Sequence, residues 1–140
     1  MERQDCIFCK IAAGQIPSIK IFENEYVLAF LDIGPISDGH TLVIPKRHYE
    51  RLDQTEPKVM AEIAKVLPAL SSAVSRAMNA EGYNVLCNNG SVAGQVVEHV
   101  HFHIIPRHPD DGVFNRWPSY QYPEDKAGQI GEKIKQNISL

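Results

Sequence analysis

The chain has 140 residues, of which 44% are hydrophobic and 22% charged, and its formal net charge is −3. This length suits a single domain with a sizeable core, and the slight acidity excludes the basic surface of a duplex nucleic-acid binder. No apolar run approaches the ~20 residues of a membrane span. Residues 1–5 lack the basic-then-apolar pattern of a signal peptide, so we expect a cytoplasmic protein without a membrane partner.

The first third of the chain predicts three strands. Residues 20–23 and 26–32 have the composition of strands and are separated by a tight turn at residues 24–25. Glycine, proline and aspartate within residues 34–39 mark a loop. Residues 40–45 follow as a third strand, because their centre is rich in residues that favour strands.

A long helix is predicted over residues 56–78, because apolar side chains recur there every three or four positions. The apolar positions are Val59, Ile63, Val66, Leu67, Leu70 and Val74. Thr55 is a suitable residue to cap the N-terminus of this helix. Pro68 falls inside the helix, so we expect a bend or a break there.

The second half continues with a strand over residues 83–88, a glycine-rich loop over residues 89–94 and a strand over residues 97–106. A C-terminal helix is predicted over residues 123–136, although Gly128 and Gly131 lower its propensity. The order strand–strand–strand–helix–strand–strand–helix predicts an α+β domain with a mainly antiparallel sheet, one long helix and one C-terminal helix.

Three histidines, His99, His101 and His103, alternate with apolar residues. At the period of a strand, all three imidazoles leave one face, which suits anionic phosphate chemistry or a metal. The alternative is the solvated polar face of an edge strand. Residues two apart on a strand are separated by about 6.6 Å and the outer pair, His99 and His103, by about 13 Å, so these two cannot bind one ion from a regular strand. The histidines not used by a metal are candidates for nucleophilic or acid–base work.

A CxxC pair, Cys6 and Cys9, lies too close to the start of the sequence for the strand that precedes a thioredoxin-like motif. In a reducing compartment, three cysteines also argue against a disulfide framework. Two thiolates need two further ligands to close a structural zinc site, and His48 and His99 are the candidates. The alternative is a pair of unpaired cysteines packed under the first helix. Cys87 is predicted to be an ordinary buried thiol in the middle of a strand.

The run from His99 to Ile105 resembles the signature of the histidine triad family, histidine–apolar–histidine–apolar–histidine–apolar–apolar. Further segments resemble this family in the same order: CIFCKI at 6–11, IP at 16–17, FLDI at 30–33, GHTLVIPKRH at 39–48, NNG at 88–90 and GQ at 94–95. The resemblance covers residues 6–107 of a single domain of residues 1–140. Residues 108–140 form its variable C-terminal segment.

The resemblance is to the small phosphoramidase-type branch, related to the purine nucleoside phosphoramidases, whose bacterial members often carry zinc. It implies a hydrolase that cleaves adenosine or other purine phosphoramidates, or related nucleotides, at the α-phosphate and releases a nucleoside monophosphate. A dinucleoside polyphosphate hydrolase is the alternative among enzymes, and a nucleotide-binding regulatory or scaffold protein with incidental activity is the alternative of another class.

Two further features of the family bear on this chain. In zinc-bearing relatives the ligands occupy the positions of Cys6, Cys9, His48 and His99, so the resemblance implies a structural Zn²⁺. Family members are two-fold homodimers. The predicted long helix and the strand after it carry more apolar surface than one small sheet needs, which supports a homodimer here.

The catalytic roles follow from the resemblance together with imidazole chemistry. His101 is the expected nucleophile, because neutral imidazole prevails at pH 7 and attacks phosphorus to give a nucleotidyl-histidine intermediate. His103 is expected to donate a hydrogen bond to the α-phosphate or the bridging atom. His40 is expected to support the triad or to act directly. The alternatives are a packed strand histidine for His101 and a merely supporting hydrogen bond for His103.

The remaining candidates bind the nucleotide. Asp32 is expected to accept both ribose hydroxyls, with a turn-capping role as the alternative. An apolar slot for the base is expected from four residues, namely Phe8, Ile11, Phe30 and Ile33. The amides of Asn88 and Gln95 suit phosphate oxygens or the leaving group, and the glycine-rich loop ending at Gly94 lets main-chain N–H groups approach a phosphate.

Overall fold

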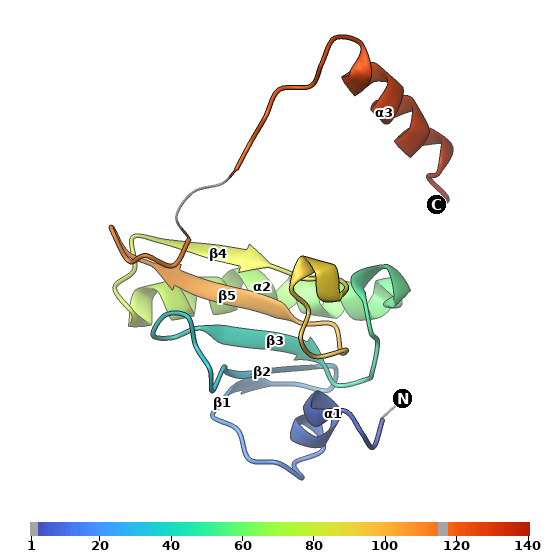
Figure 1. Ribbon diagram of the computed structural model, residues 1–140. Helices are drawn as coiled ribbons and strands as arrows, with labels where there is room; N and C mark the ends of the chain where they lie inside the picture. The colour runs from blue at the N-terminus through green and yellow to red at the C-terminus, as the bar shows by residue number, and fades with distance from the viewer. Residues whose placement is uncertain (1–2, 115–117) are drawn as a thin grey trace.

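The computed structural model describes residues 3–114 and 118–140, and its centre is one five-stranded sheet (Figure 1). The strand order is β1-β2-β3-β5-β4, and every neighbouring pair is antiparallel. The strands are β1 (Lys20–Glu23), β2 (Val27–Leu31), β3 (Thr41–Pro45), β4 (Gly82–Leu86) and β5 (Phe102–Arg107). The predicted α+β class and the antiparallel sheet are confirmed.

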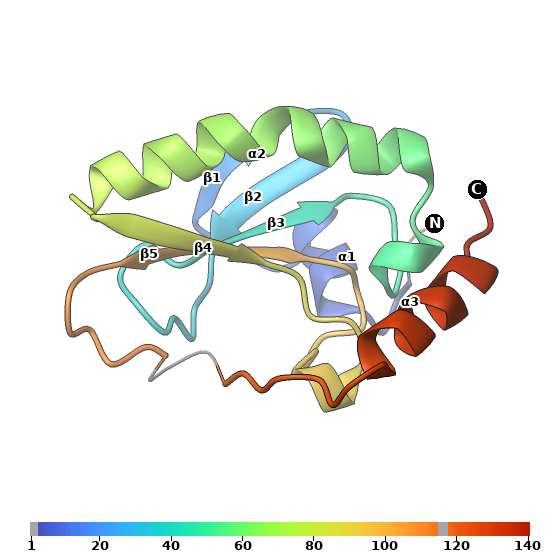
Figure 2. The ribbon, with the colours of Figure 1, turned by 90° about the horizontal axis from the view of Figure 1, so that it is seen from above.

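Helices cover both faces of this sheet, with α2 (Pro57–Ala77) on one face and α1 (Ile7–Ala12) on the other (Figure 2). The alternation of side chains along β2 accounts for this arrangement. Val27 and Ala29 pack with Ile63 of α2, whereas Leu28 and Phe30 pack with the residues of α1. Both faces of the central strands are therefore buried, and the α1 face carries the histidines described below.

The helix α2 differs from expectation at two residues. Thr55 does not cap it, because its hydroxyl donates to the Arg51 carbonyl at 2.9 Å, and the helix begins with Pro57 in its first turn. The helix is also continuous (Figure 2), and Pro68 lies inside it, so the break, one of the two outcomes expected there, does not occur. A proline removes one main-chain hydrogen bond, but Ile63 and Leu70 are buried against the sheet on either side of it and hold the helix together.

The strand predicted over residues 97–106 is shorter than expected. Its pairing with β3 ends at Phe102, and the N–H of Val100 donates instead to the carbonyl of Tyr49 at 2.7 Å. His99 and His101 therefore lie on the segment that leads into β5. The preceding strand, β4, ends at Leu86, so Cys87 lies just past the strand and is half-buried.

The rest of the chain adds three short elements. Two 3-10 helices, η1 (Leu52–Gln54) and η2 (Ser91–Ala93), lie on loops, and α3 (Lys126–Gln136) is the C-terminal helix. It begins three residues later than predicted and lies past β4, clear of the sheet, with no buried residue (Figure 1). Among the described residues, no helix is long and apolar enough to cross a membrane.

Candidate functional site

Four potential metal ligands converge beside α1. Cys6 caps this helix and Cys9 lies in its first turn, while His48 follows β3 and His99 precedes β5. The Nδ1 atom of His99 lies 3.5 Å from the sulfur of Cys6 and 3.6 Å from that of Cys9. The Nδ1 atom of His48 lies 3.4 Å from the Cys9 sulfur, and all four ligand atoms lie within 4.8 Å of one another.

These separations fit a tetrahedral zinc ion. Zn–S bonds of about 2.3 Å and Zn–N bonds of about 2.0–2.1 Å at the tetrahedral angle place sulfur and nitrogen about 3.6 Å apart. The Nε2–H of His99 donates to the Pro45 carbonyl at 2.8 Å, which leaves the Nδ1 lone pair directed at the sulfurs. Burial lowers the pKa of His99 to about 4, so its imidazole is neutral at pH 7, as a metal ligand requires.

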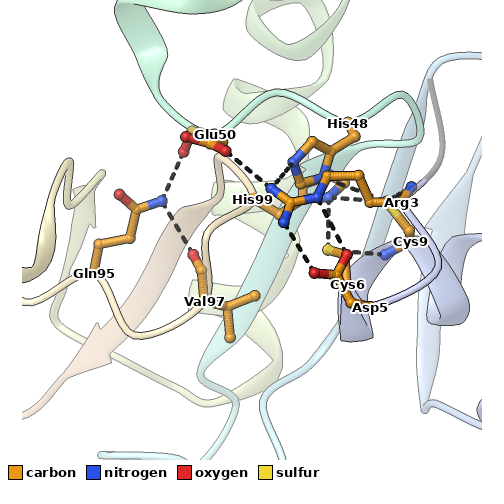
Figure 3. Close-up of polar contacts among 9 residues, drawn as sticks. All are labelled: Arg3, Asp5, Cys6, Cys9, His48, Glu50, Gln95, Val97 and His99. Atoms are coloured by element: carbon orange, nitrogen blue, oxygen red, sulfur yellow. Dashed lines mark hydrogen bonds and ion pairs between the residues drawn. The ribbon is translucent and has the colours of Figure 1, made fainter.

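Arg3 covers this cluster, and the sequence analysis did not identify it (Figure 3). Its guanidinium forms ion pairs with Asp5 at 3.0 Å and Glu50 at 2.9 Å, and lies 3.5 Å from Nε2 of His48. Its main-chain N–H donates to the Cys9 sulfur at 3.4 Å. Arg3 and Glu50 are 47 positions apart, so no local pattern in the sequence marks the pair.

His101 presents a free imidazole nitrogen. Its Nδ1 lies 2.7 Å from the main-chain carbonyl of His99. A carbonyl only accepts, so Nδ1 carries the proton and Nε2 holds a lone pair. Burial lowers the pKa of His101, which keeps the imidazole neutral at pH 7. The arrangement is that of an oriented nucleophile.

A chain of hydrogen bonds gives His103 the tautomer opposite to that of His101, with its proton on Nε2. The main-chain N–H of Ile36 donates to Nδ1 of His40 at 3.2 Å, so the proton of His40 is on Nε2. This Nε2–H donates to Nδ1 of His103 at 2.8 Å, which places the His103 proton on its Nε2. That buried Nε2 has no hydrogen-bond partner among the described residues. His103 therefore offers a donor to whatever binds beside it.

The same hydrogen bonds decide whether a second cluster of possible ligands can bind a metal ion. Asp32, His40 and His103 also lie close enough together to surround a metal ion. Because Ile36 occupies the Nδ1 lone pair of His40, its Nε2 keeps a proton and cannot coordinate. His40 and His103 form a hydrogen-bond relay, and Asp32 lies 3.7 Å from Nε2 of His40. His99 and His103 fall in two separate groups, as their spacing predicted.

The residues expected to bind the nucleoside are only partly brought together. Oδ1 of Asp32 accepts from the Gly34 N–H at 2.8 Å, as a turn-capping residue does, and its Oδ2 lies 3.7 Å from Nε2 of His40. Phe8 and Phe30 are buried in the core with their rings in edge contact, and Ile11 packs beside them. Ile33 is 92% exposed. The aromatic pair is thus part of the core, and only Ile33 of the four is largely open to solvent.

The loop before β5 holds the remaining candidates. Gly94 has a φ of +91°, and a Cβ there would lie 3.3 Å from Nδ2 of Asn88, so glycine suits this close approach. Asn88 Nδ2 donates to the Gly94 carbonyl at 3.5 Å. The carboxamide of Gln95 is directed at main-chain groups and not at an open surface. In this structure the carboxamide of Gln95 contacts only main-chain groups, and its contact with a phosphate stays a prediction.

Comparison with known proteins identifies the class. The family profile described as the HIT domain matches residues 13–110, more than half of the chain. The chain belongs to the HIT, or histidine triad, family, and the resemblance seen in the sequence is confirmed.

Particular relatives agree along most of the chain. Adenosine 5'-monophosphoramidase hnt1 of Schizosaccharomyces pombe is 46% identical over 95% of this chain and 98% of its own length. Adenylylsulfatase HINT3 of Arabidopsis thaliana is 45% identical over 78% of this chain, and the match spans 55% of that relative. The crystal structure of a HIT family member from Bacillus subtilis has a TM-score of 0.91 at 38% identity, covering 98% of this chain and 99% of that one.

Proposed function

We propose that this protein hydrolyses purine nucleoside phosphoramidates at the α-phosphate through a nucleotidyl intermediate on His101. The observation that carries the proposal is the pairing of two complementary imidazoles. His101 presents an Nε2 lone pair, and His103 presents an unpartnered Nε2–H, with ring centroids 4.9 Å apart. The activity printed in the name of the Schizosaccharomyces pombe relative supports the substrate class.

The reaction divides into two displacements at phosphorus. Nε2 of His101 forms a bond to the α-phosphorus while the P–N bond breaks, and the leaving amine takes up a proton. Water then attacks the same phosphorus, breaks the bond to His101 and releases the nucleoside monophosphate and a proton. The Nε2–H of His103 donates to a phosphoryl oxygen and stabilises the charge that develops there. His40 holds His103 in the tautomer that this role requires.

The nucleoside contacts are part of the same proposal. The free oxygen of Asp32 accepts from the ribose hydroxyls, and the exposed side chain of Ile33 contacts the base. Ile11 contributes the part of its surface that remains open, while Phe8 and Phe30 support this wall from the core. We assign Asn88 and the loop ending at Gly94 to the phosphate side. Within this loop the N–H groups of Gly90, Ala93 and Gly94 already donate to acceptors of the protein.

The test compares two substrates on one preparation. We expect the purified protein to hydrolyse an adenosine phosphoramidate with a higher kcat/KM than a diadenosine polyphosphate, with nucleoside monophosphate as the common product. The reverse order would assign the dinucleoside polyphosphate alternative. Binding of nucleoside monophosphate without turnover of either substrate would assign a regulatory or scaffold protein.

We also propose that Cys6, Cys9, His48 and His99 hold one structural zinc ion. The ion would join α1 to the segment after β3, which carries His48, and to the segment before β5, which carries His99. It would leave no open coordination position for a substrate. Elemental analysis of the purified protein should then give about one zinc per chain. Protein that is folded and free of metal would contradict this proposal.

The assembly proposed is a two-fold dimer that forms at β4. This strand is an edge of the sheet, and an edge strand presents unpaired main-chain groups to a second copy. Its side chains Tyr83 and Val85 are exposed and apolar. Sedimentation at micromolar concentration should therefore give twice the chain mass of 15.7 kDa. Replacing Val85 by lysine should shift the protein toward the single-chain mass, and a wild type that sediments as one chain would refute the dimer.

A further inference from the structure

The side chain of Gln95 is buried, only 7% of its surface being exposed, and it bonds to main-chain groups at three positions, two on its own loop and one 45 residues away. Its Oε1 accepts from the main-chain N–H of Gly90 at 2.7 Å. Its Nε2 donates to the carbonyl of Glu50 at 2.7 Å and to that of Val97 at 3.0 Å (Figure 3). Both N–H groups of the carboxamide and its oxygen are thus engaged by main chain.

One of these contacts closes the glycine-rich loop. The main-chain N–H of Gln95 donates to the Gly90 carbonyl at 3.1 Å, so the two residues are joined by two hydrogen bonds, one donated by the Gln95 main chain and one accepted by its side chain. The positive φ angles of Gly90 and Gly94 let the chain turn back on itself between them. The loop is therefore held in one conformation from within the protein.

The other two contacts lie beside the proposed metal ligands. Glu50 follows His48 by two residues, and Val97 precedes His99 by two. The Val97 carbonyl also accepts from the His99 N–H at 2.9 Å, and the His99 carbonyl accepts from Nδ1 of His101. A single carboxamide thus ties the segment that carries His48 to the segment that carries His99 and, through His99, to the nucleophile.

We propose that Gln95 is a positioning residue for both the metal ligands and His101, without touching substrate or metal. The inference rests on the proposed function. It goes beyond that function because it couples the metal site to the catalytic histidine through one side chain. The chemistry requires an amide: a carboxylate at this position would place negative oxygen against the carbonyls of Glu50 and Val97.

The experiment compares Gln95→Glu with Gln54→Glu. Gln54 lies exposed on η1, its side chain has no role in the proposed site, and the substitution makes the same amide-to-carboxylate change. Three quantities are measured on zinc-loaded protein well below the melting temperature of either variant. They are kcat and KM on an adenosine phosphoramidate, and the rate at which a chromogenic chelator takes up zinc.

Gln95→Glu should lower kcat by about tenfold or more and raise the rate of zinc release by a similar factor, the size of effect found for groups that orient metal ligands. KM should change less than kcat, because Asp32 and Ile33, the proposed nucleoside contacts, lie on another segment. Gln54→Glu should match the wild type in all three. If Gln95→Glu fails to fold, Gln95→Met, which keeps the length without charge, is measured in the same way.

A merely stabilising role predicts a different result. It would lower the melting temperature of the Gln95 variants but leave their kcat and zinc release, measured on folded protein, equal to those of Gln54→Glu, and this would overturn the inference. The wild type separates this failure from that of the proposed function. If the wild type holds no zinc or hydrolyses no phosphoramidate, the proposed function is wrong, and the proposed role of Gln95 is wrong with it.

Discussion

Replacement of His101 by alanine should lower turnover of an adenosine phosphoramidate by about three orders of magnitude or more, because the covalent route is lost with the nucleophile. The substitution removes a side chain on the site face of the sheet, so the fold and the binding of nucleoside monophosphate should persist. Steady-state kinetics and equilibrium binding on the same preparation measure the two effects separately. His103→Ala should lower turnover less, by about 10²–10³-fold, as expected for one charge-stabilising donor.

The control for this prediction is His108→Ala. His108 is an exposed histidine just past β5, and it has no hydrogen bond with His99, His101 or His103. Its Nε2 lies 3.0 Å from the Met78 carbonyl instead. This variant should keep wild-type turnover. Incubation of the wild type with labelled substrate, followed by quenching in alkali, should leave label on the protein and none on His101→Ala. Near wild-type turnover by His101→Ala would disprove the proposed mechanism.

Loss of the metal should have the largest effect on stability. A ligand present at 1,000 times its dissociation constant stabilises the folded state by about 4 kcal/mol. For a chain of this size, such a change lowers Tm by on the order of 10 °C. Cys9→Ala removes one of the four ligands and should melt that far below the wild type. Catalysis by the fraction that remains folded should change less, because the proposed zinc site has four protein ligands and would leave no open position for substrate.

Cys87→Ala is the matched control, since Cys87 is half-buried and lies outside the ligand cluster. It should bind zinc as the wild type does. A strong chelator should lower the Tm of the wild type and of Cys87→Ala, yet leave Cys9→Ala unchanged, because that variant has no bound metal to lose. A wild-type Tm that does not respond to the chelator would contradict the structural role of the metal.

Several elements were predictable because their signals are local. The six apolar positions of α2 and the turn between β1 and β2 depend on residues close together in the sequence, and both are present. That His99 and His103 belong to separate ligand groups followed from the rise per residue of a strand alone. The errors arose where distant contacts compete with local preference. The helix does not break at Pro68, because Ile63 before it and Leu70 after it are buried against the sheet. The strand expected from residue 97 begins at Phe102 because Val100 bonds to Tyr49.

The sequence by itself determined the class of fold and the candidate ligands and catalytic histidines, because residue type and spacing are written in it directly. Only the tertiary structure decided which nitrogen of each imidazole carries the proton. The carbonyls of Pro45 and His99 and the N–H of Ile36 assign the protons on His99, His101 and His40. The same holds for Gln95, whose amide appeared suited to phosphate but is engaged by the main chain of Gly90, Glu50 and Val97. A polar side chain takes its role from the partner that folding places within hydrogen-bond distance, and several of these partners are 45 or more positions away.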